Sequence, residues 1–430
     1  MQKKQKLQAP TGMHDILPTD QPYFEKVYET AKDLATFYGF SRIDTPLMED
    51  AKLYEKGTGI ATDIVEKQMF LLRTKGGDIL ALRPEFTPGI ARAYLQHGML
   101  NLPQPVKLWT SGPVFRYEHP QQGRYRQFHQ FDLEVLGDES PAIDAQVIQI
   151  FYSLLKELKI PHLTIEVNSI GDSQCRPYYK KLLVNFLRTR QYSLCQDCRR
   201  RMKTNPMRIL DCKEEKCQRV RVQAPQVIDH LCEECKTHFT SLLELLDEAD
   251  LPYHLDPYLV RGLDYYTKTV FEIVAERATS QDEGKPPALA GGGRLDNLVK
   301  VLGNKDVPCS GAAAGIERIV GLMKELGITP QTASLPKVFF AQLGESAKKK
   351  SVKLLEELRE ANIPVAESLG RDSLRAQLAR ADKLGVALTL ILGQREVLDN
   401  TIVVRRMDNG VQETIKVDKV VEEIKKRLRK

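Results

Sequence analysis

The sequence predicts two domains: an α+β domain built around a mainly antiparallel sheet, and a smaller C-terminal α/β domain. Residues 1–330 mix strand and helix patterns irregularly, without the regular alternation of a doubly wound sheet. A polar linker that contains two prolines occupies residues 327–336. Residues 331–430 then alternate strands and helices, which is typical of a small α/β domain.

In the first domain, the patterns typical of helices and strands follow one another in no regular order. Apolar residues at helical spacing that end at Gly39 predict a helix over residues 23–38. Short apolar runs bounded by proline or glycine indicate strands. By these criteria we expect strands at residues 79–82, 106–109 and 163–167 and a second helix at residues 146–158.

A cysteine-rich segment interrupts this domain. Seven of the eight cysteines lie between Cys175 and Cys235, and residues 199–221 are strongly basic. We expect an insertion at about residues 175–245, mostly helical at its ends. Its two C-x-x-C pairs have the spacing of zinc ligands, but free thiols fit the same pattern. The sequence therefore assigns no metal ligand and leaves zinc binding open for Cys195, Cys198, Cys212, Cys217, Cys232 and Cys235.

The C-terminal domain shows shorter, more regular elements. Buried-strand patterns alternate with amphipathic helix patterns along it. We expect strands at residues 338–341, 364–366 and 387–392 and helices at residues 348–361, 374–384 and 420–428.

The composition is that of a soluble globular protein: 42% of the 430 residues are hydrophobic and 28% are charged. The net charge of +6 permits a nucleic-acid partner without requiring one. The N-terminus has lysines but no apolar run of a secretory signal, and no stretch of about 18 apolar residues could span a bilayer. Clustered cysteines in a chain of this kind indicate a reducing compartment, so we expect a cytoplasmic location and no membrane partner.

Several common catalytic motifs are absent from the sequence. It contains neither the G-x-x-x-x-G-K-[ST] phosphate loop nor a G-x-G-x-x-G dinucleotide fingerprint, although residues 291–294 are glycine-rich. The H-E-x-x-H and G-x-S-x-G motifs of zinc peptidases and α/β-hydrolases are missing too. If a nucleotide binds, arginine side chains must hold its phosphates.

Residues 115–137, FRYEHPQQGRYRQFHQFDLEVLG, predict an unusually charged β-hairpin that turns at residues 120–123. From Arg124 onward the residues alternate between two faces. An ordinary strand with this pattern would be a solvated edge strand. The alternative is a polar ligand site, because the two strands would present charged groups on one surface: Arg116, Glu118, Gln130 and Glu134.

The same residues carry a resemblance. Residues 115–118 with 123–130 are similar to motif 2 of class II aminoacyl-tRNA synthetases in its histidyl form, and residues 311–318, GAAAGIER, resemble motif 3. Residues 259–266, LVRGLDYY, resemble a signature peculiar to histidyl-tRNA synthetases. Residues 82–87 resemble the amino-acid-binding loop of that family, and residues 44–49 resemble motif 1, which builds its dimer interface. The resemblance runs over nearly the whole chain and implies the class II synthetase fold.

The resemblance implies ATP as a substrate with Mg²⁺, and no tightly bound organic cofactor. The two catalytic residues would be Arg116 and Arg261, which lie against the α-phosphate from opposite sides. Fixed guanidinium groups there stabilise the charge that develops when a carboxylate attacks the α-phosphorus. Mg²⁺ would bridge the outer phosphates. In the remaining ATP-binding set, Glu118 and Arg318 would seat the adenine, while Arg124 and Arg318 would contact the outer phosphates.

The resemblance likewise implies a histidine pocket. Glu85, Thr87 and Gln130 would hold the α-ammonium group, and Glu134 and Tyr266 would meet the imidazole nitrogens. A pocket matched to both ring nitrogens rejects ligands that leave its buried groups unpaired. The implied set of histidine-binding residues is Glu85, Thr87, Arg116, Gln130, Glu134, Arg261, Tyr265 and Tyr266.

The implied activity is that of a ligase that forms histidyl-adenylate and transfers histidine to the 3′ end of tRNA(His), as a homodimer. Residues 370–374, with Gln377, residues 381–382 and residues 392–396, are similar to an anticodon-binding domain. Three positions depart from the family pattern: Thr11, His119 and Leu295.

Two other functions are compatible with parts of this resemblance. A synthetase-like regulatory subunit of ATP phosphoribosyltransferase binds histidine without charging tRNA, but it lacks the anticodon domain and motif residues that this chain retains. A prolyl or threonyl synthetase would not carry the R-G-L-D-Y-Y stretch at residues 261–266.

Overall fold

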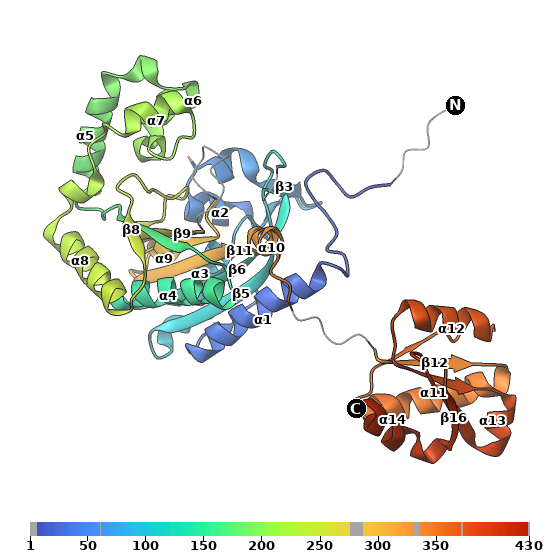
Figure 1. The fold of residues 1–430 in the computed structure, drawn as a ribbon. Coiled ribbons are helices and arrows are strands. Elements are labelled where there is room, and N and C mark those ends of the chain that lie inside the picture. Colours follow the sequence, from blue (N-terminus) through green and yellow to red (C-terminus); the bar gives the residue numbers. More distant parts are fainter. Residues whose placement is uncertain are drawn as a thin grey trace, which may run out of the picture. The chain divides into compact units, whose positions relative to one another are not determined.

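The computed structural model describes residues 7–60, 62–121, 123–275, 287–330, 336–370 and 373–428. The chain divides into two compact units, residues 1–330 and 331–430 (Figure 1). Residues 331–335, half of the predicted linker, and two residues of the 370–374 stretch, Arg371 and Asp372, lie outside the described residues. Within the described residues, no helix is both long and apolar enough to cross a membrane.

The first unit is built on an eight-stranded sheet of the order β1-β5-β6-β11-β10-β9-β7-β8. Strands β1 and β8 pair in parallel with their neighbours, and every other described pairing in this sheet is antiparallel. The predicted α+β domain with a mainly antiparallel sheet is therefore confirmed. The strands are β1 (Ser41–Arg42), β5 (Val106–Phe115), β6 (Gln127–Leu136), β7 (Leu163–Ser169), β8 (Tyr253–Leu255), β9 (Thr267–Ala275), β10 (Ala290–Arg294) and β11 (Cys309–Gly315).

The hairpin predicted at residues 115–137 is formed by β5 and β6, but its strands have other limits. Strand β6 lies between β5 and β11 and is buried on both faces from Gln130 onward, so it is not a solvated edge strand. The prediction that Arg116, Glu118 and Arg124 lie on strands was wrong, because β5 ends at Phe115 and β6 begins at Gln127. The described residues between these strands, 116–121 and 123–126, form an excursion from the sheet, in which an isolated bridge joins Gln121 and Arg124.

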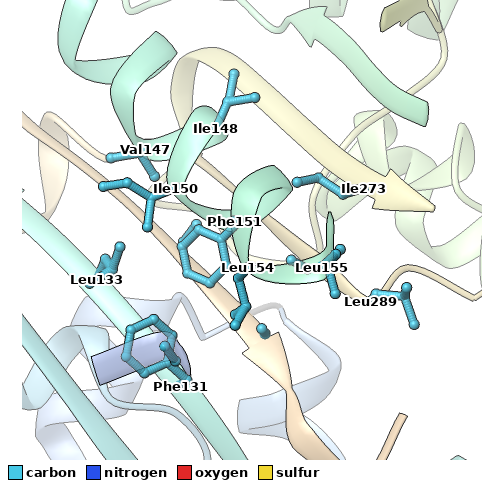
Figure 2. Close-up of a cluster of buried hydrophobic side chains, with 14 of the residues drawn as sticks. Phe131, Leu133, Val147, Ile148, Ile150, Phe151, Leu154, Leu155, Ile273 and Leu289 are labelled. Atoms are coloured by element: carbon cyan, nitrogen blue, oxygen red, sulfur yellow. The ribbon is translucent and has the colours of Figure 1, made fainter. Parts of the chain in front are cut away.

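A large apolar core lies between the sheet and helices α1 (Gln21–Phe37) and α4 (Pro141–Glu157). Helix α4 begins five residues before the predicted position, because Ser140 caps it and Pro141 suits the first turn. Figure 2 shows α4 side chains packed over β6, where the rings of Phe131 and Phe151 lie 5.8 Å apart. This core packs against one face of the sheet and makes the sheet a rigid support for the side chains on its other face.

The remaining elements of the first unit surround this sheet. A separate three-stranded sheet has the order β2-β4-β3, and the long insertion between β7 and β8 is helical along its length rather than mainly at its ends (Figure 1). These elements are β2 (Met48–Asp50), β3 (Phe70–Arg73), β4 (Ile79–Leu82), α2 (Ala51–Thr58), α3 (Thr87–Gln96), α5 (Arg176–Arg188), α6 (Gln196–Thr204), α7 (Glu215–Arg221), α8 (Glu233–Glu248), α9 (Asn297–Gly303) and α10 (Ile316–Glu325).

The second unit is an α/β domain, as predicted. Its five-stranded sheet has the order β13-β12-β14-β15-β16, in which β12 pairs in parallel with β13 and β14, and the other pairs are antiparallel. Gln377 is buried, and its side chain exchanges two hydrogen bonds with the main chain of Gln342. The elements are β12 (Val338–Gln342), α11 (Glu345–Glu360), β13 (Val365–Glu367), α12 (Leu374–Lys383), β14 (Leu388–Leu392), α13 (Gln394–Asp399), β15 (Thr401–Arg406), β16 (Gln412–Lys416) and α14 (Val420–Leu428).

Candidate active site

A cavity of about 340 Å³ opens over the sheet of the first unit, beside the excursion between β5 and β6. It adjoins a smaller cavity of about 40 Å³, and both are lined by Arg116, Gln130 and Arg261. The sequence-predicted residues come from five separate stretches of the chain, and all except Glu134 line one of these two cavities. The structure therefore brings the predicted set together.

The larger cavity has arginines on several sides. Arg116 donates to the Pro84 carbonyl at 2.9 Å, and Arg318 donates to the carbonyls of Gly123 and Ala288 at 3.2 and 2.9 Å. Burial and the positive charges of Arg124 and Arg116 lower the pKa of Arg318. Mutually repelling guanidinium groups around one cavity are stabilised by an anion, so this wall is suited to phosphate groups.

Arg261 is held at the junction of the two cavities by an ion pair with Glu272 of β9. Its guanidinium carbon also lies 5.7 Å from the ring centre of Tyr266. The negative charge of Glu272 raises the pKa of Arg261 against the opposing effect of burial. Gly291 leaves room for this arrangement, since a Cβ atom there would come within 2.8 Å of the guanidinium. The arginine is thus fixed and charged before any ligand arrives.

The smaller cavity is lined by acids, hydroxyls and an amide. Glu85 is buried and accepts hydrogen bonds from Thr58 at 2.7 Å and from Tyr265 at 2.6 Å. Burial raises the pKa of Glu85, although these two hydrogen bonds oppose the shift. A carboxyl group held in this way is suited to a ligand with an ammonium group.

Glu134 lies beneath this cavity. It is 3% exposed and accepts a hydrogen bond from Thr87 at 2.5 Å. Burial raises the pKa of Glu134 well above its ordinary value. Gly311 on the neighbouring strand β11 makes room for the carboxyl group, because a Cβ atom would lie 1.9 Å from its Oε2. Glu134 does not line the cavity itself, but its hydrogen bond connects it to Thr87, which does.

Asp132 is not among the residues that the sequence predicts as ligands, yet it lines the smaller cavity at 1% exposure. Among the described residues, its Oδ1 and the Oε1 of Gln130 lack a hydrogen-bond partner. Burial and the charge of Glu85 raise the pKa of Asp132 well above its ordinary value. Its position two residues after Gln130 on the same strand face is the sequence signal that could have found it.

The three departures from the family pattern have different surroundings. Thr11 and His119 are exposed and line neither cavity, although His119 directly follows the cavity-lining Glu118. Leu295 is 2% exposed and lines the smaller cavity, so only this departure alters the wall of the candidate site.

We expect Asp132→Asn to raise the free energy of unfolding of the ligand-free protein by about 1–2 kcal/mol near neutral pH. A carboxyl group whose pKa is raised by folding favours the folded state only while it is protonated. Its contribution is complete below its unfolded pKa of about 4 and is lost as the pH rises through the folded value. Urea unfolding of both proteins between about pH 4 and about pH 8 should show that the difference between their free energies of unfolding grows as the pH rises. A difference that stays constant with pH would contradict this explanation.

Comparisons with known proteins show the family of this chain. A family model described as histidyl-tRNA synthetase matches residues 12–319, and one described as an anticodon binding domain matches residues 337–427. A histidine–tRNA ligase from Dehalococcoides mccartyi is 44% identical over 98% of this chain and 100% of its own length. Another from Caldicellulosiruptor bescii is 40% identical over 99% of this chain and 100% of its own.

The solved structures include a similar whole-chain fold. The crystal structure of apo histidyl-tRNA synthetase from S. aureus has a TM-score of 0.80 and 33% identity, and covers 98% of this chain and 100% of its own. The predicted class II architecture, with a catalytic domain and an anticodon-binding domain, is therefore confirmed. On the strength of the matched family model and these full-length relatives, the chain belongs to the histidyl-tRNA synthetase family.

Proposed function

We propose that the chain activates L-histidine with ATP, forming histidyl-adenylate and pyrophosphate, and then transfers histidine to the 3′ end of tRNA(His). The observation that carries this proposal is the junction of an arginine-lined cavity with a small, acid-lined one, with Arg261 at the boundary. The bond between histidine and the α-phosphate must form at such a boundary. Family membership adds ATP, histidine and tRNA as expected substrates.

We assign the larger cavity to ATP. Arg116 and Arg261 flank the α-phosphate, Arg124 and Arg318 contact the outer phosphates, and Glu118 and Arg318 seat the adenine. Arg124 is half-exposed beside Glu118, at 4.0 Å, so it can move onto a ligand at little cost. Glu118 and Glu272 supply carboxylate oxygens, which suit Mg²⁺, on the wall of this cavity. Bound with ATP, Mg²⁺ would draw charge from the leaving pyrophosphate.

We assign the smaller cavity to histidine. Glu85, Thr87 and Gln130 bind the α-ammonium group, while Glu134 and Tyr266 contact the imidazole and Tyr265 supports Glu85. The unpartnered Oε1 of Gln130 and the buried acids favour a ligand that brings hydrogen-bond donors. Histidine brings them at both ends, through its ammonium group and its ring N–H.

The direct test is ATP–pyrophosphate exchange with each of the twenty amino acids in turn. We expect exchange with histidine and none above background with the others. Histidine binding without exchange would instead favour a regulatory subunit, and exchange with proline or threonine would indicate another synthetase.

We assign adenylate formation to residues 1–330 and anticodon binding to residues 331–430. A chain that ends at Pro330 should retain exchange but lose at least about tenfold in the rate of tRNA charging, because tRNA contacts worth about 1.4 kcal/mol or more are removed. Exposed Arg375 and Arg395 are suited to such contacts in the second unit. Exchange in the same sample serves as the control for folding, and equal charging by both chains would refute the assignment.

We further propose a cytoplasmic homodimer. Leu71 and Ile79 share one face of the three-stranded sheet and are 56% and 53% exposed, and Met48, on its other face and within the motif 1 region, is 47% exposed. An exposed apolar sheet of this kind favours a second copy as its partner. Light scattering should give twice the chain mass of 48.8 kDa. Leu71→Glu should weaken the dimer, whereas Leu398→Glu, at an exposed leucine of the second unit, should not.

A further inference from the structure

Four cysteines of the insertion converge on one point. The sulfur atoms of Cys195, Cys198, Cys212 and Cys217, here called the four-cysteine cluster, all lie within 4.8 Å of one another. Three of the four residues are buried, and the Sγ atoms of Cys195 and Cys212 are 3.9 Å apart. Zinc bound tetrahedrally with Zn–S bonds of about 2.3 Å requires sulfur atoms about 3.8 Å apart. The cluster is close to that geometry.

The main chain directs these sulfur atoms as hydrogen-bond acceptors. The N–H of Cys195 donates to the Sγ of Cys217 at 3.2 Å, and the N–H of Cys198 donates to the Sγ of Cys195 at 3.4 Å. Such hydrogen bonds stabilise thiolates and orient them as metal ligands. The strongly basic residues 199–221 also offset the negative charge of four thiolates around one divalent ion. A disulfide would join two sulfur atoms and would not require four to converge.

A second group lies where the chain enters and leaves the insertion. Asp172 and Cys175 stand between β7 and α5, and Cys232 and Cys235 stand at the start of α8. Their ligand atoms also lie within 4.8 Å of one another, and the Sγ atoms of Cys175 and Cys235 are 3.7 Å apart. We call this group the aspartate–cysteine cluster. It supplies one oxygen and three sulfur ligands, a set that zinc accepts.

We propose that the insertion binds two structural Zn²⁺ ions, one in the four-cysteine cluster and one in the aspartate–cysteine cluster. All four protein ligands are present in each cluster, so neither site leaves the open position that a catalytic zinc needs. The first ion would fold the small helical part of the insertion. The second would join its two ends where they leave the catalytic unit.

The four-cysteine cluster has a direct connection to the candidate active site. Arg201 and Arg208, from the segment that this cluster encloses, both bind Asp63, at 2.7 and 2.8 Å. Arg208 also donates to the carbonyl of Gly262, the residue after Arg261. Zinc would therefore keep the loop that carries Arg261 in position through Arg208.

Elemental analysis of the full-length protein, expressed with zinc and desalted, tests the proposal without any assay of activity. We expect two zinc ions per chain in the unaltered protein and one in each double variant, Cys198→Ser/Cys217→Ser and Cys175→Ser/Cys235→Ser. Cys309→Ser is the matched control, because Cys309 is a buried cysteine outside both clusters. It should retain both ions.

A second measurement uses the unaltered protein, in case the variants do not fold. Zinc should be displaced by Co²⁺ to give the intense thiolate-to-cobalt absorption of tetrahedral sulfur sites, and chelation should lower the melting temperature until zinc, but not magnesium, is restored. The proposal is overturned if the protein contains no zinc and takes up no cobalt. It is equally overturned if non-reducing mass analysis shows disulfides among these cysteines.

Discussion

Replacing Arg261 with alanine is expected to lower the rate of histidine-dependent ATP–pyrophosphate exchange by about 10²–10³-fold, while histidine and ATP still bind. Arg261 lies at the junction of the two cavities, where the attacking carboxylate and the α-phosphate would meet. Because both reactants are anionic, a fixed cation there stabilises the transition state more than the bound substrates. Its ion pair with Glu272 holds it in place in advance.

Exchange kinetics and equilibrium binding of histidine, measured on the same sample, separate this effect from a loss of folding. Arg261→Lys should restore little of the rate, because an ammonium group lacks the planar fork that contacts two oxygens. Arg219→Ala is a suitable control, since it removes an arginine–glutamate ion pair on α7 that lies outside both cavities. Exchange rates unchanged in Arg261→Ala would remove the role assigned to it.

Replacing Glu134 with alanine should lower kcat/KM for histidine by about 10²–10³-fold and leave KM for ATP nearly unchanged. Glu134 is buried below the smaller cavity and receives its hydrogen bond from Thr87. Without the carboxyl group, the Thr87 hydroxyl and a ring nitrogen of the histidine that we propose to bind here would both lose a hydrogen-bond partner. Unpaired buried polar groups cost about 1–3 kcal/mol each.

A double-mutant cycle of Glu134→Gln with Thr87→Ala should show non-additive losses, because the two side chains act through one hydrogen bond. Asp144→Asn provides the control. Asp144 is a buried carboxylate of the same unit whose ion pair is with Arg294, at 2.9 Å, away from the two cavities. It should reduce stability without raising KM for histidine. Additive losses in the cycle, or a similar rise of KM in both proteins, would contradict the assignment of Glu134.

The alternation of apolar and polar residues was enough to predict a minority of the individual elements, some of them with the right limits. Helix α14 begins and ends where the sequence predicts, as does strand β4. Strand ends in the hairpin were predicted less well, because the period of two continues through Arg124 and Arg126 although their main chain leaves the sheet. The N–H of Arg126 instead donates to the carbonyl of Gly12, at 2.7 Å, and no local pattern could have indicated that contact.

For this protein, the sequence by itself determined the fold class, because the patterns of helices and strands are local properties, and the resemblance of its motifs to a known family indicated most of the residues that meet in the candidate site. Only the tertiary structure decided how those residues are paired. Asp132 became part of the site because β6 is a central strand with both faces buried, which depends on its neighbours β5 and β11. The cysteine clusters likewise depend on the fold, since Cys175 and Cys235 are 60 positions apart and meet only because the start of α5 lies beside the start of α8.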